Sequence, residues 1–273
     1  LVFQRRSAPV QVTWLGYPNT TGMSAIDYRI TDAIADPPGA EPLWREALIR
    51  LEAGFLCYAP PADAPDVAPL PALSKGHVTF GSFNNLRKVT PAVIETWAKI
   101  LRRIPTARLM LKARSFADTA TRDRFIGAFV SHGVSAERVI LRDTVASTAE
   151  HLGAYADVDI ALDPFPYNGT TTTCEALWMG VPTVTLQGNR HAARVGASLL
   201  THTGLCDWIA GNTGAYVEAA IRHAKDIQAL ATLRRGLRDL AAHSPLCDAP
   251  GFALRMEAAF ERIVPTSAKD SGN

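Results

Sequence analysis

The sequence predicts an α/β fold in which a parallel sheet is covered on both faces by helices. From Gly76 onward, short apolar runs rich in β-branched residues alternate with segments of helical periodicity. Helix start and stop signals fall between these runs, and this alternation is typical of βαβ units. The chain has 273 residues, of which 47% are apolar, so it is long enough to bury a full core.

Five strands are expected in this region, over residues 78–83, 109–111, 139–141, 160–162 and 183–186. Helices are expected between them, over residues 91–104, 117–132, 148–156 and 172–179. Thr90 and Pro91 supply a capping residue and a proline at the first helical position. Ser147 and Glu150 have the spacing of a capping box. Residues 76–245 are therefore expected to form one Rossmann-like domain.

The two ends of the chain follow different patterns. Residues 1–35 contain two expected strands, over 10–15 and 28–31, which we interpret as the end of a preceding α/β domain. Residues 36–75 are rich in proline and are expected to be a linker and surface excursion, with a helical pattern over 43–51. Further helices are expected over 213–225 and 226–242, with a C-terminal helix within 246–265 and disorder over 266–273. The chain does not begin with methionine, so we expect it to be part of a longer protein.

Composition and charge argue against several classes of partner. The net charge is +2, and no basic run is long enough to indicate a nucleic-acid surface. No apolar run approaches the roughly 20 residues that span a bilayer, and the N-terminus lacks the layout of a signal peptide. The four cysteines are scattered without paired spacing, which favours free thiols and a cytoplasmic protein.

The most informative segment covers residues 159–185. A strand leads into a Pro/Asn/Gly loop, followed by four threonines at 170–173 and a helix that ends at Gly180. The first turn of a helix has unpaired N–H groups and a partial positive charge, so it binds phosphate well. Thr170, Thr171 and Thr172 add hydroxyl donors, while Glu175 could accept hydrogen bonds from sugar hydroxyls. The alternative is a helix capped by threonine for stability alone.

A second polar loop follows the strand at 78–83 and precedes the helix at 91–104. In this loop Lys88 could neutralise a diphosphate and Asn85 could orient a neighbouring oxygen. The alternative is an Asn-rich turn with a solvated lysine. Because the carboxyl ends of parallel strands meet at one edge of a sheet, the two loops are expected to form one cleft.

Other polar residues are weaker candidates. His151 could stack on a nucleobase or simply pack in the core, and His191 and Arg194 could approach the cleft from the next strand end. Asp157 and Asp159 form a D-x-D pattern, but they lie at the amino end of a strand, away from the cleft, and are expected to be structural. No histidine has metal-ligand spacing with another histidine or cysteine, so no metal is expected.

Several motifs resemble the protein O-linked N-acetylglucosamine transferase family. They are QVTWLGYPNTTG over 11–22, DYRITD over 27–32, the segment 83–88 and the segment 169–175. The run TTTTCE at 170–175 is similar to the SPINDLY-type branch, whereas other members usually have histidine at the position of Thr170. The resemblance covers about residues 5–263 in consistent order.

This resemblance implies the two-domain glycosyltransferase fold called GT-B, with the C-terminal half complete and only the end of the N-terminal half present. Upstream tetratricopeptide repeats and the rest of the N-terminal half are expected in the full-length protein. Lys88 matches the essential lysine that stabilises the leaving diphosphate, and Asn85 falls near the phosphates. The implied donor contacts continue with Thr171 and Thr172 on the diphosphate, Glu175 on ribose, His151 on the base, Ala146 at the base edge, and Leu15 and Gly16 at the transferred sugar.

The implied activity is inverting, metal-independent transfer of a sugar from a nucleotide sugar to serine or threonine hydroxyls of proteins. The donor would be UDP-GlcNAc or, as in plant SPINDLY proteins, GDP-fucose. Two other classes stay open: a nucleotide-binding module that transfers nothing, and an epimerase or hydrolase of related fold. An epimerase would require carboxylates close to the sugar, and none is obvious beside the threonines. No residue of this chain stands out as a general base.

Overall fold

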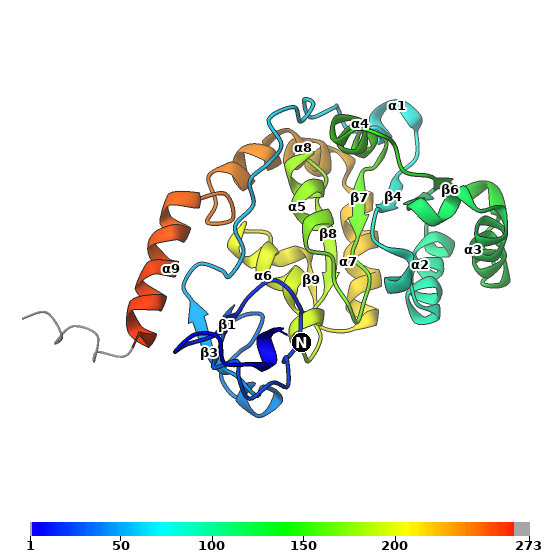
Figure 1. Ribbon diagram of the computed structural model, residues 1–273. Helices are drawn as coiled ribbons and strands as arrows, with labels where there is room; N and C mark the ends of the chain where they lie inside the picture. The colour runs from blue at the N-terminus through cyan, green and yellow to red at the C-terminus, as the bar shows by residue number, and fades with distance from the viewer. Residues whose placement is uncertain (1, 265–273) are drawn as a thin grey trace, which may run out of the picture.

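The computed structural model describes residues 2–264, which form two parallel sheets surrounded by helices (Figure 1). The α/β architecture expected from the sequence is confirmed. Within the described residues, no helix combines the length and the apolar character that crossing a membrane requires. The tail expected to be disordered, 266–273, lies outside the described residues.

The larger sheet has six strands in the order β6-β5-β4-β7-β8-β9, all paired in parallel. Its strands are β4 (Thr79–Ser82), β5 (Arg108–Lys112), β6 (Val139–Arg142), β7 (Ile160–Leu162), β8 (Thr183–Leu186) and β9 (Ile209–Ala210). The five strands expected from the sequence are confirmed, and the short β9 is additional. The strand order reverses between β4 and β7, and in such sheets ligands bind at this switch point.

Helices follow the strands of this sheet, and the periodicity predicted all of them except α6. They are α2 (Pro91–Arg103), α3 (Thr119–Ser131), α4 (Thr148–Gly153), α5 (Thr171–Trp178), α6 (Val195–His202), α7 (Thr213–Lys225) and α8 (Ile227–Ala242). The expected caps are present: the Thr90 side chain accepts from the N–H of Val93, and Ser147 with Glu150 forms a complete capping box. Local sequence therefore determines where these helices begin.

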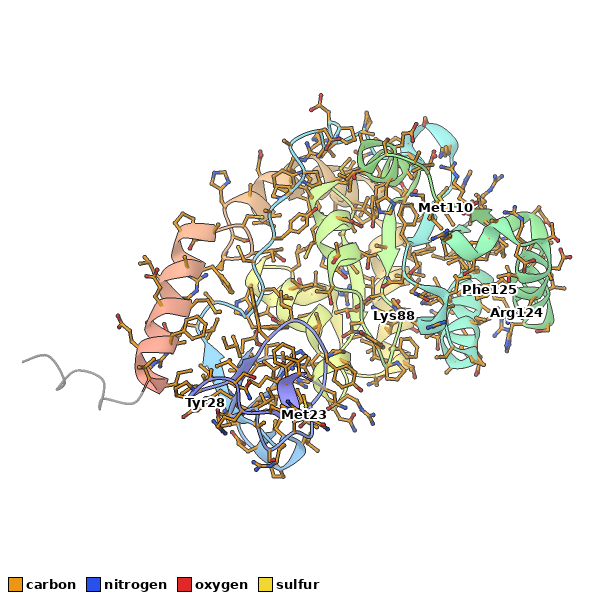
Figure 2. All side chains as sticks on the ribbon, in the orientation of Figure 1. Met23, Tyr28, Lys88, Met110, Arg124 and Phe125 are labelled. Carbon is orange, nitrogen blue, oxygen red and sulfur yellow. The ribbon has the colours of Figure 1, made fainter. Side chains whose placement is uncertain are left out.

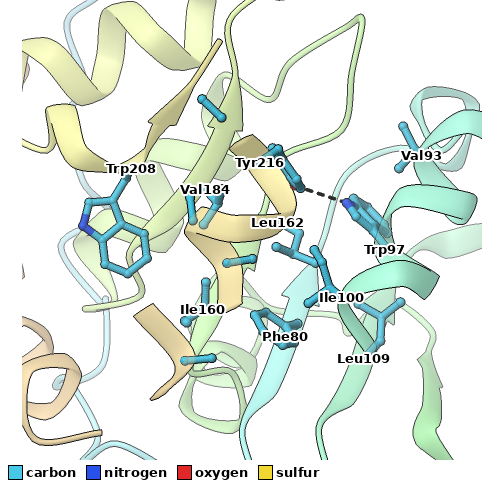
Figure 3. Close-up of a cluster of buried hydrophobic side chains, with 14 of the residues drawn as sticks. Phe80, Val93, Trp97, Ile100, Leu109, Ile160, Leu162, Val184, Trp208 and Tyr216 are labelled. Atoms are coloured by element: carbon cyan, nitrogen blue, oxygen red, sulfur yellow. Dashed lines mark hydrogen bonds between the residues drawn. The ribbon is translucent and has the colours of Figure 1, made fainter. Parts of the chain in front are cut away.

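The core lies on both faces of the sheet because side chains alternate along its central strands. Leu109 and Leu111 of β5 point to the face covered by α2 and α7, while Met110 points to the face where Tyr155 packs. Between α2 and α7, the indole N–H of the fully buried Trp97 donates to the Tyr216 hydroxyl at 3.1 Å (Figure 3). This polar contact fixes two helices that cover one side of the switch point.

The smaller sheet contains β1 (Val12–Thr13), β2 (Tyr28–Asp32) and β3 (Ala47–Leu51), paired in parallel in that order. The expected helix over 43–51 is wrong, because this segment forms β3 after a short 3-10 turn, Glu41–Leu43. The sheet therefore extends past residue 35 into the segment interpreted as a linker. The reason is tertiary: all five residues of β3 pair with β2, and Ile49 and Leu51 pack against the C-terminal helix.

That C-terminal helix, α9 (Ala249–Ile263), returns to the smaller sheet (Figure 1). Phe252 of α9 stacks on Trp14 with ring centroids 5.5 Å apart. The Trp14 indole N–H also donates to the backbone carbonyl of Phe55 at 2.8 Å. Because α8 ends beside the larger sheet and α9 packs on the smaller one, the chain crosses between the two units twice. The first crossing, after β3, includes the short helix α1 (Ala72–Lys75).

The D-x-D pattern has the structural role expected from its position. Asp159 is fully buried, and its two carboxylate oxygens accept from the backbone N–H groups of Ala72 (2.9 Å) and Thr79 (2.7 Å). Asp157 forms ion pairs with Lys75 and Arg142 near the surface. The pair thus ties the segment around α1 to the amino end of the sheet.

Substituting these two aspartates one at a time compares the contribution of the buried carboxylate to stability with that of the exposed one. Asp159→Asn exchanges one carboxylate acceptor for an amide donor that would face a backbone N–H. We expect the free energy of unfolding to fall by about 1–3 kcal/mol, the cost of an unsatisfied buried donor. Asp157→Asn should cost less than about 1 kcal/mol, because exposed ion pairs contribute little. Urea unfolding followed by circular dichroism measures both, and equal losses would contradict this assignment.

Candidate functional site

The loops after β4 and β7 meet at the switch point of the larger sheet. Lys88, at the end of the first loop, donates from Nζ to the backbone carbonyl of Asn168 in the second loop at 2.7 Å. Its ammonium also lies 4.1 Å from the centroid of the Tyr167 ring. Figure 2 shows Lys88 between the larger sheet and α2. Beside this contact, Phe83 and Asn84 of the first loop and Thr172 at the start of α5 line one pocket, so the two loops meet at a cleft on this edge of the sheet.

The N-terminus of α5 faces this cleft. Thr170 is the N-cap residue but makes no capping hydrogen bond with its side chain, so its hydroxyl is not used to stabilise the helix. The first N–H groups of any helix lack intrahelical acceptors, and here they belong to Thr171 and Thr172. A Cβ at Gly169 would lie 2.6 Å from the Thr172 hydroxyl, so only glycine fits before the threonines. The arrangement presents donors and a helix dipole to an anion.

Of the two neighbouring asparagines, the structure directs Asn84 toward the threonines. Asn84 is buried, and its Oδ1 accepts from the Thr172 hydroxyl at 3.1 Å. Asn85 is exposed, and its Oδ1 accepts from the backbone N–H of Arg87, which caps a short 3-10 turn. Sequence reasoning selected Asn85 and missed Asn84. The available signal was position, since Asn84 follows the last residues of the strand more closely.

A buried carboxylate, Asp163, shapes the loop beneath Lys88. Its oxygens accept from the N–H of Gly169 (2.6 Å) and from the Thr185 hydroxyl (2.7 Å). Burial raises the pKa of Asp163 to about 7, although these hydrogen bonds and the charge of Lys88 oppose the shift. Burial likewise lowers the pKa of Lys88, and the charge of Asp163 opposes that shift. Sequence reasoning also missed Asp163, because a single aspartate after a strand has no distinguishing pattern.

One turn into α5, Glu175 contacts the aromatic residues behind the cleft. Its Oε2 lies 3.1 Å from Nε2 of His151 and 3.5 Å from the Tyr155 hydroxyl. Tyr155 also donates to the backbone carbonyl of Thr172 at 3.1 Å. Ala146 lies exposed in the loop that precedes α4, the helix carrying His151. The proposed ribose and base contacts therefore come from elements that adjoin the threonine helix.

The smaller sheet contributes a second wall. Leu15, Thr170 and His191 line one pocket of about 50 Å³ together with Trp14 and Arg29. Leu15 is exposed, and so is the adjacent Gly16. Their loop is held from below by Arg29, which donates to the carbonyl of Tyr17 at 2.8 Å. The loop matched to the transferred sugar thus lies beside the first threonine of the anion site.

His191 and Arg194 connect the two sheets. His191 is buried, with Nδ1 2.7 Å from Asp36 and Nε2 3.1 Å from Arg29. Arg194 donates to the backbone carbonyls of Ile34 (2.6 Å) and Gly188 (3.0 Å). His191 reaches the pocket wall, whereas the guanidinium of Arg194 is occupied by the backbone. Within residues 2–264, no group of three histidine, cysteine or acidic side chains is arranged to hold a metal ion.

The buried carboxyl of Asp163 predicts a pH-dependent stability. Its folded-state pKa of about 7 lies above the ordinary value near 4, so the folded chain binds an extra proton between these limits. The free energy of unfolding should therefore fall as pH rises from about 4 to about 7 and then level off. Asp163→Asn should remove this slope, since an amide does not titrate but can still accept from Gly169 and donate to Thr185.

Urea unfolding at several pH values between about 5 and 8 tests this. The difference between wild type and Asp163→Asn should change with pH by a few kcal/mol. Asp143→Asn, at an exposed aspartate in the loop after β6, is the matched control and should keep the wild-type slope. Parallel curves for wild type and Asp163→Asn would contradict the expected titration.

The sequence of this chain is similar to that of one glycosyl transferase family and to several plant proteins. The family profile of glycosyl transferase family 41 matches residues 1–58 and 70–256. The chain is 50% identical, over 94% of its length, to a protein of Arabidopsis thaliana described as probable UDP-N-acetylglucosamine–peptide N-acetylglucosaminyltransferase SPINDLY. It is 51% identical to the protein of the same description from Solanum lycopersicum. The chain spans 28% of the length of each of these relatives.

Solved structures agree with this relationship. A mutant O-GlcNAc transferase from Thermobaculum terrenum superposes with a TM-score of 0.90 at 42% identity, over 95% of this chain and 49% of that one. A sucrose-phosphate synthase from Thermosynechococcus elongatus matches in fold alone, with a TM-score of 0.56 at 16% identity over 87% of this chain and 58% of that one. These neighbours confirm the GT-B fold. With the profile matching most of its length and the plant relatives about half identical, the chain belongs to glycosyl transferase family 41.

Proposed function

We propose that the protein containing this chain transfers a sugar from a nucleoside diphosphate sugar to serine or threonine hydroxyls of proteins. The observation that carries the proposal is the convergence of Lys88 with the loop entering α5. Lys88 contacts the carbonyl of Asn168, two residues before the N-cap of that helix. An ammonium group and a helix N-terminus that face one cleft form a site for a pyrophosphate.

The chemistry follows from charge development. In an inverting transfer, the acceptor oxygen forms a bond to the anomeric carbon while the bond from that carbon to the diphosphate oxygen breaks. The acceptor proton passes to a general base, which we propose lies in the N-terminal catalytic half, and negative charge grows on the diphosphate. Lys88 and the N–H groups of Thr171 and Thr172 would bind this charge more tightly in the transition state than in the ground state. No metal ion is needed in this scheme, and we propose that the reaction is metal-independent.

Neighbouring side chains complete the proposed donor site. Glu175 would accept hydrogen bonds from the ribose hydroxyls, since a carboxylate one turn beyond the phosphate site favours neutral hydroxyl groups. His151, whose ring is about one-quarter exposed, would pack on the base near Ala146. Leu15 and Gly16 would contact the transferred sugar across the pocket shared with Thr170. Asn84 would hold the Thr172 hydroxyl in position, while Asn85 could reach an outer phosphate oxygen.

We propose UDP-GlcNAc as the donor, because the plant relatives are described as probable UDP-N-acetylglucosamine–peptide N-acetylglucosaminyltransferases. GDP-fucose is the alternative, suggested by the SPINDLY-type run at 170–175. Calorimetric titration of UDP, GDP, UDP-GlcNAc and GDP-fucose into the full-length protein distinguishes the two. In that protein we further propose an upstream N-terminal catalytic half, tetratricopeptide repeats and a cytoplasmic location.

Lys88→Ala should reduce sugar transfer by about 100-fold to 1000-fold, the usual effect of removing one preorganised charge-stabilising group. Transfer is measured with radiolabelled donor and the full-length protein, and circular dichroism verifies folding. Arg87→Ala is the matched control, because within residues 2–264 the side chain of this exposed neighbour forms no hydrogen bond or ion pair, and only its backbone N–H is engaged. It should stay within about 2-fold of wild type. Undiminished turnover by Lys88→Ala would remove the lysine from the mechanism.

A further inference from the structure

A lysine outside the set of predicted site residues lies directly behind His151. Lys112, the last residue of β5, is only 2% exposed, and its Nζ lies 2.6 Å from Nδ1 of His151. Within residues 2–264, His151 is its one side-chain hydrogen-bond partner, and no carboxylate lies within ion-pair distance of it. Its Nζ also lies 5.4 Å from the centroid of the Phe83 ring. Burying an ammonium group without a carboxylate partner is costly, and such groups are retained more often at functional sites than for stability.

The hydrogen-bonding capacities of this chain of groups determine the state of the imidazole. A lysine ammonium can only donate, so Nδ1 of His151 must accept. The Glu175 carboxylate, 3.1 Å from Nε2, can only accept, so Nε2 must carry the proton. Only the neutral tautomer with the proton on Nε2 satisfies both contacts. In a doubly protonated ring, the Nδ1–H group would face the Lys112 ammonium, so two donors of like charge would oppose each other.

Aromatic side chains hold the imidazole of His151 in place, and only Lys112 and Glu175 form hydrogen bonds with its ring nitrogens. Phe83, the residue after β4, and Tyr155 pack edge-on against the ring, with centroids 6.1 and 6.2 Å away. Burial lowers the pKa of Lys112, the charge of Glu175 opposes this shift and that of Arg142 adds to it. Glu175 and Arg142 are therefore the charged groups that act on the ammonium from the neighbouring elements. His151 and Glu175 are 28% and 17% exposed, so they can reach a ligand that Lys112 cannot.

We propose that Lys112 is a positioning residue for the nucleotide ribose: it selects the Nε2-protonated tautomer of His151, whose N–H then orients the Glu175 carboxylate toward the ribose hydroxyls. This inference rests on the proposed function, because it assigns Glu175 to the donor ribose. It adds a residue that touches neither sugar nor phosphate and acts through a relay of two hydrogen bonds. Lys112 therefore controls donor affinity and leaves the charge stabilisation at Lys88 unaffected.

The binding test uses the full-length protein and compares UDP with 2′,3′-dideoxy-UDP, and GDP with its dideoxy analogue. In wild type, removal of the hydroxyls should weaken binding by about 10-fold or more, as for hydrogen bonds to a charged group. In Lys112→Met this penalty should shrink to within about 3-fold, because Glu175 is no longer held in place. Lys112→Arg, which keeps a donor for Nδ1, should restore most of the penalty.

Lys99→Met is the matched control, at an exposed lysine of α2 that pairs with Glu95, and it should keep the full wild-type penalty. If Lys112→Met weakens the binding of UDP and of its dideoxy analogue equally, the penalty is unchanged. Lys112 is then merely structural, and the proposal fails.

A second readout needs no ligand. Nitrogen-15 NMR of histidine-labelled protein, with the His151 signal assigned by its loss in His151→Gln, should show the Nε2-protonated tautomer in wild type. In Lys112→Met the ring should lose this single state, because Glu175 still holds the proton on Nε2 while Nδ1 becomes free to carry a second proton. An unchanged spectrum in Lys112→Met would overturn the proposal. If neither UDP nor GDP binds to wild type, the proposed function fails while this measurement still decides the role of Lys112.

Discussion

The site depends on one contact between two loops, the hydrogen bond from the Lys88 ammonium to the carbonyl of Asn168. The loops are about 80 residues apart in sequence, and they meet because β4 and β7 are adjacent strands with parallel direction. Their carboxyl ends therefore project to the same edge, where the strand order reverses. A cation and a helix N-terminus converge there. The proposed phosphate chemistry is a consequence of this topology.

A buried polar network fixes the position of the smaller sheet relative to that edge of the larger sheet. Arg29, His191 and Asp36 form one chain of contacts, and Asp32 accepts from the Ser198 hydroxyl of α6 at 2.5 Å. Such groups are costly to bury unless each has a partner, so the network specifies a single arrangement of the two sheets. Two of its members, Arg29 and His191, line the small pocket that also contains Leu15 and Thr170. Two residues considered as ligand contacts, His191 and Arg194, thus belong largely to the structure that supports the site.

The cleft also contains ionisable groups that are buried more deeply than stability alone would favour. Asp163 lies under the loop of Lys88, and Lys112 lies behind His151. Asp163 accepts from Gly169, the residue before the threonines, and Lys112 contacts His151. Burial shifts the pKa of both groups toward the neutral form, and ionisable groups with shifted pKa values concentrate at functional sites. Asp163 and Lys112 extend the proposed site beyond the residues that motifs identify, and they would orient the side chains that contact the donor.

The sequence by itself determined the alternation of strands and helices, the caps at Thr90 and Ser147, and the start of a helix at the threonine run. These features are local: hydrophobic periodicity and capping depend on residues within a few positions of one another. The resemblance to the family could also be recognised from motifs spread along the chain. Tertiary structure alone decided that residues 47–51 form a strand, because pairing with β2 and packing on α9 outweigh a short helical pattern. It likewise decided that Asn84 faces Thr172 and that Lys112 contacts His151, since such contacts depend on which strands become neighbours and which way each side chain then points.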